Sequence, residues 1–401
     1  MKKILIAEDS AQVRETLKSV VEMWGYEADT ASDGSEALRK MEDSPPDLVI
    51  IDIMMPVLHG LNLLQKIKAG EKTSNIKVVI YTGKDFESEK AKALELGADA
   101  YVTKAENIEI LKSRIKNLLE GEDTSFNIEI FGARGSIPAP GKNYEKYGGN
   151  TSCVKLKAGE SLFILDAGTG IRELGRTLSG TGEKVSAFLL FTHTHWDHIQ
   201  GFPFFAPAYD PGNEFIVYGP RSMDRSLEDT FKLQFDPNYF PVSVSDLSSR
   251  IRFRDLTEES FSCGPVDIST VYLNHPGMTL GYAFKRSGRK ICYITDNELT
   301  GEAGAESVDG AGRLSEFISG SDLCIMDAQY TDLEYPEKRG WGHSPIGRVL
   351  SLAEGAGVSR LILFHHDPDH TDEDMDLILD SARERSGISV DAAREGDSLD
   401  I

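Results

Sequence analysis

Residues 1 to about 120 alternate short apolar runs with amphipathic stretches. Four apolar runs fit buried strands, at residues 3–7, 47–51, 77–81 and 98–102. Apolar residues at helical spacing predict five helices, at residues 12–24, 35–41, 61–69, 87–97 and 108–120. The five helices, each taken with a preceding strand, are interpreted as five βα units in series, although only four of the strands show an apolar run. They predict an α/β domain over residues 1–121 with a doubly wound, five-stranded parallel sheet.

The pattern changes after a short polar segment, residues 121–125, which is predicted to be a linker. Strand-like runs separated by glycine-rich loops follow, at residues 127–131, 152–156, 161–165, 187–191, 215–218, 290–294, 323–326 and 361–364. This pattern predicts a second, strand-rich domain over residues 126–401. Within it, residues 220–263 are predicted to be an insertion between core strands, either a lid or a packing element.

Polar residues follow the strands of the first domain where ligands bind in a doubly wound sheet. Glu8 and Asp9 follow the first strand, Asp52 the third, Thr82 the fourth and Lys104 the fifth. Clustered carboxylates repel one another unless a hard divalent cation joins them, and Mg²⁺ suits a site built from oxygen ligands. A lysine and a hydroxyl beside them could stabilise a phosphoryl group on a carboxylate nucleophile.

Residues 1 to about 120 resemble the receiver domain of two-component response regulators. The resemblance rests on Glu8 and Asp9, the stretch IDIMMP at 51–56 with Gly60, YTG at 81–83 and AYVTK at 100–104. It implies that Asp52 accepts the phosphoryl group and that Mg²⁺ is bound by Glu8, Asp9, Asp52 and the carbonyl of Met54. It also implies that Thr82 and Lys104 contact the phosphoryl group and that Tyr101 is the switch aromatic. Two residues depart from the usual pattern: Glu8 replaces the commoner Asp, and Ala105 stands where Pro usually follows the lysine.

The second domain contains the motif THTHWDH at residues 192–198, directly after a predicted strand. Two histidines at positions i and i+2, His193 and His195, can reach one metal from a turn, while Asp197 and His198 face a second metal. Paired metals supply a nucleophile at neutral pH and hold both oxygens of a displacement. The motif therefore predicts a dinuclear metal site.

A dinuclear site needs further ligands, and three predicted strand ends downstream supply them. His275 lies in a loop after a strand, Asp296 ends the run at 290–294 and could bridge both metals, and the run at 361–364 ends in His365 and His366. We prefer His365 over His366 because it is the first residue after the strand.

The second half resembles the metallo-β-lactamase fold, an α+β protein built as a four-layer αβ/βα sandwich, over residues 126–401. Residues 162–168 match its early strand with the support aspartate Asp166, and residues 192–198 match its signature. Gly342, His343 and Ser344, followed by the strand that ends in His365, are similar to RNase Z and related phosphodiesterases. Pro345 replaces the Thr that usually follows the His-Ser pair, and no basic, Gly/Pro-rich arm for tRNA is found.

The resemblance implies a role for each site residue. One metal would be held by His193, His195 and His275, the other by Asp197, His198 and His365, and Asp296 would bridge them. Asp197 and His343 are the expected catalytic residues, with His343 as the general acid that protonates the leaving group. Zinc is the expected metal, and manganese and iron accept the same ligands.

Composition narrows the expected partners. The net charge of -22 is uneven, because residues 1–121 hold 17 Lys and Arg against 21 Asp and Glu, which leaves 26 against 44 in the rest. Such a surface repels long nucleic acids but does not exclude a small phosphate ester in a metal-lined pocket.

No apolar run approaches the roughly 18 residues of a membrane helix, and no signal peptide is found, so a cytoplasmic protein is expected. The four cysteines lack metal or disulfide spacing.

The sequence thus predicts a response regulator whose output domain is a dinuclear-metal hydrolase. The preferred activity is a phosphodiesterase acting on a small, cyclic-nucleotide type of phosphodiester and regulated by phosphorylation of Asp52 from a sensor histidine kinase. Three alternatives remain: a di-iron oxygen or redox sensor, whose relatives commonly carry Glu in place of His195; a thioesterase, glyoxalase or lactamase; and a non-catalytic partner-binding module. Pairing through the last receiver helices would give a homodimer.

Overall fold

The computed structural model describes residues 1–401 except 84–86, 105–107, 122–123, 223 and 301–310. Ala105, which departs from the receiver pattern, and part of the predicted linker lie outside the described residues. The chain divides into two compact units, Met1–Asp123 and Thr124–Ile401, and each is described by itself.

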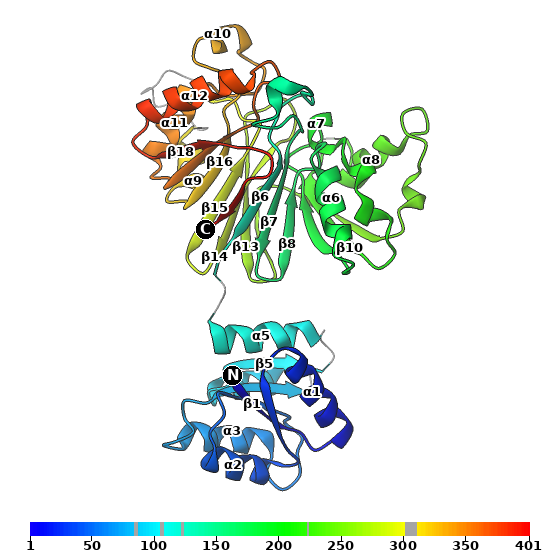
Figure 1. Ribbon diagram of the computed structural model, residues 1–401, viewed down its shortest axis with the longest axis vertical. Helices are drawn as coiled ribbons and strands as arrows, with labels where there is room; N and C mark the ends of the chain where they lie inside the picture. The colour runs from blue at the N-terminus through cyan, green and yellow to red at the C-terminus, as the bar shows by residue number, and fades with distance from the viewer. Residues whose placement is uncertain (84–86, 105–107, 122–123, 223, 301–310) are drawn as a thin grey trace. The chain divides into compact units, whose positions relative to one another are not determined.

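The first unit is a five-stranded parallel sheet in the order β2-β1-β3-β4-β5 (Figure 1). Its strands are β1 (Lys3–Ala7), β2 (Glu27–Ala31), β3 (Leu48–Ile51), β4 (Lys77–Thr82) and β5 (Ala100–Thr103). Its helices are α1 (Ala11–Met23), α2 (Gly34–Asp43), α3 (Gly60–Ala69), α4 (Glu87–Glu95) and α5 (Ile108–Glu120). The predicted doubly wound fold is confirmed.

Both faces of this sheet are covered by helices. Leu17 of α1 and Leu111 of α5 pack with strand residues on one face, while Met41 of α2, Leu64 of α3 and Ala93 of α4 pack on the other. Burial on both faces explains why the central strands are continuous apolar runs. It also leaves the carboxyl ends of the parallel strands as the edge at which polar side chains can meet.

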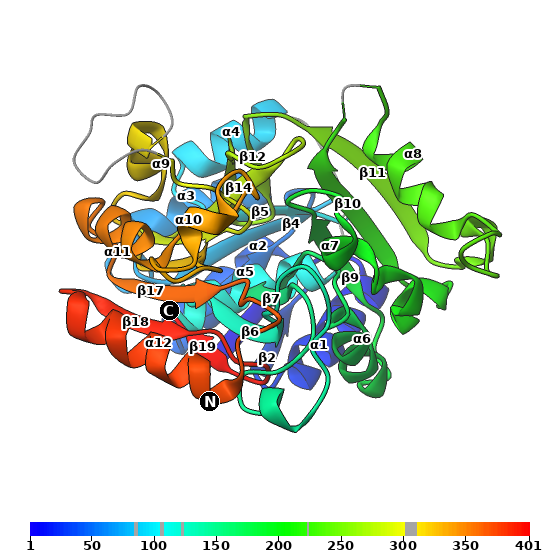
Figure 2. The same ribbon diagram turned by 90° about the horizontal axis from the view of Figure 1, so that it is seen from above.

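The second unit contains two seven-stranded sheets (Figures 1 and 2). The first follows the order β11-β10-β9-β8-β7-β6-β19 and the second β12-β13-β14-β15-β16-β17-β18. The strands of the first sheet are β6 (Asn127–Gly132), β7 (Cys153–Ala158), β8 (Ser161–Leu165), β9 (Ser186–Leu190), β10 (Glu214–Pro220), β11 (Arg250–Leu256) and β19 (Ser398–Asp400). Those of the second are β12 (Ser260–Cys263), β13 (Val266–Tyr272), β14 (Leu280–Arg286), β15 (Arg289–Ile294), β16 (Leu323–Asp327), β17 (Arg360–Phe364) and β18 (Ser389–Ala392).

The two sheets pack face to face, and helices cover their outer faces. Side chains from both sheets, such as Phe163 and Tyr293, share one buried cluster between them. The α-helices are α6 (Ile171–Gly180), α7 (Trp196–Ile199), α8 (Leu227–Lys232), α9 (Ala311–Ile318), α10 (Tyr335–Lys338), α11 (Ile346–Gly355) and α12 (Asp372–Arg385). Short 3₁₀ turns are η1 (Lys142–Tyr144), η2 (Phe202–Phe204), η3 (Ala206–Tyr209), η4 (Leu233–Phe235) and η5 (Val244–Asp246). Because α6 and α8 pack on the first sheet and α9, α11 and α12 on the second, the predicted αβ/βα sandwich is confirmed.

The predicted insertion, residues 220–263, is a packing element in the structure. β11 extends the first sheet by pairing in parallel with β10. Leu227, Phe231 and Phe235 are buried in the cluster beneath it. All four cysteines of the chain are buried and free, and no helix in the described part is long and apolar enough to cross a membrane.

Two glycines allow the segment around α7 to lie directly on the loop after β8. A Cβ atom on Gly201 would overlap the carbonyl oxygen of Gly168, and one on Gly168 would overlap the carbonyl oxygen of Asp197. Backbone atoms cannot move aside as the end of a flexible side chain can. This contact therefore fixes the height of α7, which carries Asp197 and His198, above the sheet.

We expect Gly201→Ala to destabilise the second unit by about 2–3 kcal/mol, because the added methyl overpacks a backbone contact. The measurement is thermal unfolding followed by circular dichroism. Gly180→Ala is the matched control, because Gly180 is exposed at the end of α6 and a Cβ atom added there would meet no neighbour within 4 Å. Equal unfolding temperatures for the two variants would contradict the packing role of Gly201.

Candidate functional site

The predicted receiver residues meet at the carboxyl edge of the first sheet. Lys104 Nζ lies 2.7 Å from Asp52 Oδ2 and 2.8 Å from Glu8 Oε2. Burial raises the pKa of Glu8 despite the opposing effect of Lys104. Burial by itself would lower the pKa of Lys104, but its hydrogen bonds to Asp52 and Glu8 raise it. The edge thus holds a lysine shared between two carboxylates.

Asp9 completes a group with Glu8 and Asp52 whose carboxylate oxygens lie within 4.8 Å of one another. Thr82 is buried at the end of β4, and its carbonyl accepts a hydrogen bond from the backbone N–H of Lys104. The backbone N–H of Met54 donates to Asp52 Oδ1 at 3.2 Å. Tyr101 lies on β5, half-buried. These positions agree with an oxygen-lined cation site beside Asp52, and the roles of the residues stay predictions.

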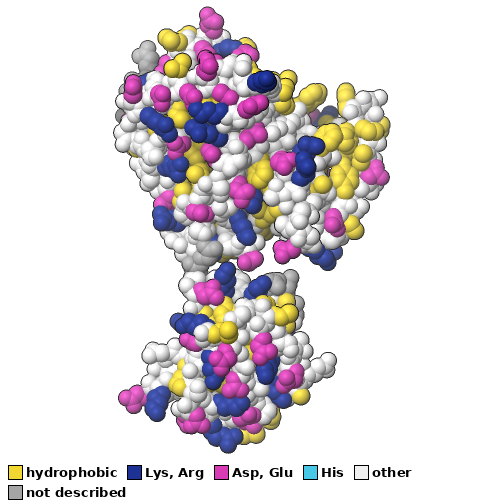
Figure 3. Space-filling model, in the orientation of Figure 1, with side chains coloured by type: hydrophobic (Ala, Val, Ile, Leu, Met, Phe, Trp, Pro, Cys, Tyr) yellow, Lys and Arg dark blue, Asp and Glu magenta, His cyan; other side chains and the backbone are white. Residues whose placement is uncertain are grey.

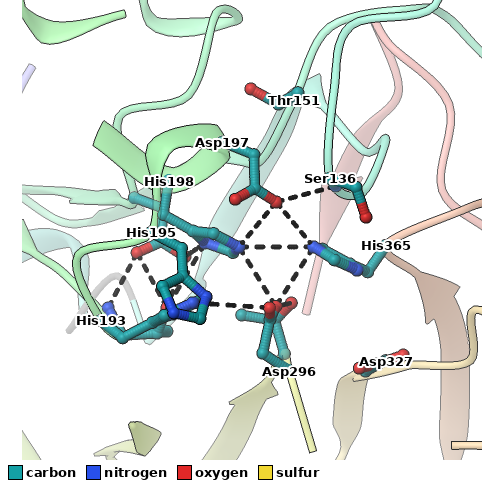
Figure 4. Close-up of polar contacts among 12 residues, drawn as sticks. Ser136, Thr151, His193, His195, Asp197, His198, Asp296, Asp327 and His365 are labelled. Atoms are coloured by element: carbon teal, nitrogen blue, oxygen red, sulfur yellow. Dashed lines mark hydrogen bonds and ion pairs between the residues drawn. The ribbon is translucent and has the colours of Figure 1, made fainter. Parts of the chain in front are cut away.

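The second unit brings together the predicted histidines and aspartates of the metal site (Figure 4). His193 and His195 lie in the loop after β9, and Asp197 and His198 lie on α7. The other members come from three more strand ends: His275 between β13 and β14, Asp296 after β15 and His365 after β17. Segments far apart in sequence therefore supply one cluster, in which Asp296 occupies the centre.

One half of the cluster surrounds Asp296 Oδ1. His198 Nε2 and His365 Nε2 each lie 3.2 Å from this oxygen. His198 Nε2 lies 3.3 Å and His365 Nε2 3.1 Å from Asp197 Oδ2, and the two nitrogens are 3.3 Å apart. Asp197 and Asp296 both have pKa values below the usual range, because the nearby histidines outweigh the effect of burial.

The other half surrounds Asp296 Oδ2. His193 Nε2 lies 3.5 Å and His275 Nε2 3.6 Å from this oxygen. His195 Nδ1 lies 3.1 Å from His275 Nε2. Burial, together with the neighbouring His198, holds the pKa of His193 well below its usual value. His193 Nε2 is itself buried and has no hydrogen-bond partner in the described part of the protein.

Most ring nitrogens on the outer side of the cluster are held by other groups. His198 Nδ1 contacts Asp166 Oδ2 at 2.9 Å, His275 Nδ1 contacts the Gly342 carbonyl at 2.9 Å, and His365 Nδ1 contacts Gln329 Oε1 at 3.1 Å. An N–H on the outer nitrogen leaves the lone pair of the inner nitrogen free for a cation. His366 instead contacts the Ala393 carbonyl through Nε2 and lies outside the cluster.

Several residues of the cluster are held in an unusual backbone conformation. Of the six described non-glycine residues with positive φ, four belong to this site: Ser136 at 63°, Asp166 at 58°, Asp296 at 53° and His365 at 61°. Such conformations cost about 1–3 kcal/mol each and persist where the surroundings enforce them. Asp166, Asp296 and His365 turn the chain just after β8, β15 and β17, while Ser136, in the loop after β6, donates its N–H to Asp197 Oδ2 at 2.8 Å.

The spacing of these donor atoms fits a pair of divalent cations. Nitrogen ligands about 2.0–2.1 Å from a tetrahedral zinc ion lie roughly 3.3–3.4 Å from one another, close to the 3.3 Å between His198 Nε2 and His365 Nε2. The donor atoms form two groups of four that share Asp296, and within each group the atoms lie within 4.8 Å of one another. The unpartnered nitrogen of His193 supports the same assignment, because a buried polar atom without a partner is costly.

His343 lies beside the cluster with a partner, Asp327, that was not predicted from the sequence. Its Nδ1 is 2.7 Å from Asp327 Oδ2, and both side chains are buried. Burial alone would lower the pKa of His343, but the Asp327 carboxylate, with Asp296 and Asp197, raises it to about 9. Asp327 could have been found from its position in the sequence, because it follows the apolar run at 323–326 just as Asp296 follows the run at 290–294.

A cavity of about 460 Å³ opens onto these residues. Its lining includes His195, Asp197, His275, Asp296, His343 and His365. No described residue of the 220–263 segment contributes to it. The cluster is therefore reachable from solvent, with the His343 and Asp327 pair beside it.

Two features define the class of protein. The first unit is a five-stranded parallel sheet with carboxylates and a lysine at one edge, and the second unit is an αβ/βα sandwich with a cluster of histidines and aspartates. The protein is a response-regulator receiver domain fused to a metallo-β-lactamase-fold domain. The chain belongs to the β-lactamase superfamily, since the superfamily domain matches residues 162–366, about half of the chain. The response regulator receiver domain matches residues 4–116.

Individual relatives match one domain or the other. The alkaline phosphatase synthesis transcriptional regulatory protein PhoP of Bacillus subtilis (strain 168) is 37% identical over 118 residues, which cover 29% of this chain and 48% of that protein. The metallo-β-lactamase fold protein YhfI from Bacillus subtilis has a TM-score of 0.52 and 16% identity over 69% of this chain and 100% of that one. A diphosphatase from the PhnP family has a TM-score of 0.50 and 18% identity over 68% of this chain and 97% of that one. The chain spans about half the length of the curated relatives it matches, and the two structures share its fold.

Asp166 connects the cluster to the core, since its carboxylate accepts hydrogen bonds from the backbone N–H of Thr192 at 2.8 Å and from the Tyr293 hydroxyl at 2.9 Å, besides contacting His198. We expect Asp166→Ala to lower the free energy of unfolding of the second unit by about 3–5 kcal/mol, because it leaves several buried donors unpaired. Tyr293→Phe removes one of these bonds and should cost about 1 kcal/mol. Urea denaturation of both variants measures the difference, and equal losses would show that Asp166 is not the centre of this network.

Proposed function

We propose that the second unit is a metal-dependent phosphodiesterase whose rate is set by phosphorylation of Asp52 in the first. The observation that carries the proposal is His343, which lines the same cavity as the two-part histidine and aspartate cluster and is paired with the buried Asp327 behind it. A cluster alone supports metal binding. An imidazole held at Nδ1 by a carboxylate adds a proton donor aimed at a leaving group.

The donor set suits two divalent cations. His193, His195 and His275 would hold one, Asp197, His198 and His365 the other, and Asp296 would join them. When bound, such a pair supplies Lewis-acid stabilisation of a phosphoryl group and a nucleophile at neutral pH. Zinc is the preferred metal for this nitrogen-rich set, with manganese and iron as alternatives.

The reaction follows from the placement of the protein groups. A water oxygen forms a bond to phosphorus while the bond from phosphorus to the ester oxygen breaks. Asp197 lines the cavity and would orient the water. His343 would give its proton to the departing alkoxide, and the proton that the water loses would pass to the solvent, from which His343 is protonated again. Asp327 fixes the orientation of the His343 ring and stabilises its protonated form. The products are a hydroxyl group and a phosphate monoester, which stay on one molecule when the phosphodiester is cyclic.

The surroundings favour a small substrate. Lys338 is the only lysine or arginine among the described residues that line the 460 Å³ cavity. The volume falls within the roughly 300–1,000 Å³ of small-molecule sites. On the face shown in Figure 3, basic side chains are interspersed with acidic ones and form no continuous stripe for a polyanion. A compact phosphodiester of the cyclic-nucleotide type fits these limits better than a long nucleic acid.

The first unit supplies control in this proposal. Asp52 would accept a phosphoryl group from a sensor histidine kinase, with Mg²⁺ held by Glu8, Asp9, Asp52 and the Met54 carbonyl. Thr82 and Lys104 would contact the phosphoryl group, and Tyr101 would respond to it. In support, Lys104 already lies within hydrogen-bond distance of Asp52.

The activity is tested with purified protein of measured metal content on a panel of phosphodiesters, a thioester and a β-lactam. We expect turnover of a phosphodiester, and we expect His343→Ala to lower kcat by about 10²–10⁴-fold, the usual contribution of a general acid, with metal content unchanged. His59→Ala, a half-buried histidine of the other unit, is the matched control.

The other outcomes identify the competing functions. Absence of phosphodiester hydrolysis by metal-loaded protein with Asp52 phosphorylated would refute the proposal. Hydrolysis of the thioester or the β-lactam alone would assign the unit to those hydrolases. Oxygen-dependent absorption changes in an iron-loaded sample would instead indicate a di-iron sensor.

Regulation is tested with Asp52→Ala. A small-molecule phosphodonor should change the rate of the wild-type protein and leave the rate of Asp52→Ala unaltered, because the variant lacks the acceptor carboxylate. Asp47→Ala is a matched control, since Asp47 binds Lys2 on the surface of the same unit. Equal responses of the wild type and Asp52→Ala would remove Asp52 from the pathway.

A further inference from the structure

Two tryptophans lie on the rim of the cavity that contains the metal cluster. The chain has three tryptophans, and two of them, Trp196 and Trp341, line this one cavity. Trp196 is 78% exposed and Trp341 58% exposed. Large aromatic side chains are normally buried, since their apolar area is costly to leave in water. Their exposure at one opening therefore suggests a ligand that covers them.

Both tryptophans are fixed relative to the reacting groups. Trp196 begins α7, between the cluster members His195 and Asp197. Trp341 lies two residues before His343. A ligand that contacts these rings is thereby placed at a set distance from the cluster and from the proton donor.

The turn that carries Trp341 is held in place by a buried carboxylate. Glu298 accepts hydrogen bonds from the backbone N–H groups of Gly340 and Gly342 and from the Tyr335 hydroxyl, at 2.9, 3.1 and 2.8 Å. The segment on both sides of Trp341 is thus anchored while the indole itself remains exposed. This rigidity suits recognition, because little ordering of the turn is needed when a ligand binds.

Lys338 adds a positive charge to the same rim. Its ammonium lies 4.4 Å from the centre of the Trp341 ring and 5.8 Å from that of Tyr330. Aromatic rings on which bases stack, combined with a cation near the phosphate, are the usual elements of nucleotide recognition. Asp369, a carboxylate in the lining, offers an acceptor for amino or hydroxyl groups.

We propose that Trp196 and Trp341 form a stacking subsite for the aromatic base of a nucleotide-type phosphodiester whose phosphorus lies at the metal cluster. The reaction at phosphorus in this inference rests on the proposed function, but the binding of the base to the two tryptophans does not. Lys338 attracts the phosphate-bearing ligand to the rim. A substrate without an aromatic group gains nothing from these residues.

The test compares two substrates that share a ring and differ in the base: adenosine 3′,5′-cyclic monophosphate and 1-O-methylribose 3,5-cyclic phosphate. Trp196→Ala and Trp341→Ala should each raise KM for the nucleotide about 5- to 150-fold, the usual effect of losing one stacked base, with kcat largely kept. Neither should change KM for the base-free compound. The Trp→Phe variants should recover part of the affinity.

Tyr239→Ala is the matched control, because Tyr239 is 81% exposed and lies outside the cavity lining. It should leave both substrates unaffected. Equal losses on both substrates in the tryptophan variants would overturn the proposal, since a general structural defect does not distinguish a base from its absence.

A binding measurement separates this inference from the proposed reaction. Adenosine 5′-monophosphate is titrated into the full chain, and binding is followed by equilibrium dialysis and by quenching of tryptophan fluorescence. If neither cyclic phosphate is hydrolysed but the nucleotide binds and loses affinity in both Trp→Ala variants, the proposed reaction fails and the base subsite stands. If the wild type does not bind the nucleotide, or all variants bind it equally, the subsite is refuted.

Discussion

The buried carboxylate of Asp296 is the constraint on which the second unit depends. It is 2% exposed, and four histidine nitrogens lie 3.2–3.6 Å from its two oxygens. Taking a carboxylate out of water costs several kcal/mol unless opposite charge and hydrogen bonds compensate. The histidines can compensate only if separate segments deliver them to one point. Two sheets packed face to face achieve this, because their strand ends open onto a common edge.

This requirement explains why the site is held so rigidly. The positive φ angles at Asp166, Asp296 and His365 turn the chain at three strand ends. Contact between Gly168 and the residues around α7 sets the height of the histidine motif. Arg134, which is fully buried, donates to the carbonyls of Asp367 and His370 and holds the loop after His365. Backbone contacts around the cluster thus hold these strained residues in their positive-φ conformations.

Polar residues at strand ends could be predicted from the sequence, whereas residues that act through distant partners could not. Parallel strands buried on both faces leave continuous apolar runs, so the polar residues after them, such as Asp52 and Asp296, could be found. β2 was missed, because EADTA is an edge strand with one fully buried residue. Asp327 ends the run at 323–326 and so had the same positional signal, but its pairing with His343 had none. Arg134 acts through partners distant in sequence, and a single chain carries no periodic signal for such contacts. The preference for His365 over His366 rested on the order of residues alone, and the structure places His365 in the cluster and His366 outside it.

The two units use the same placement of polar groups for different chemistry. In the first, one lysine neutralises two carboxylates, and the edge is shallow enough for Asp9 and Met54 to be exposed. Oxygen ligands at an open edge would suit a hydrated Mg²⁺ ion. In the second, nitrogen ligands whose outer atoms are held by Asp166, Gly342 and Gln329 suit a resident metal. In the proposed function, the difference between a reversible signal site and a resident catalytic one would therefore lie in how many neighbours hold each ligand in place.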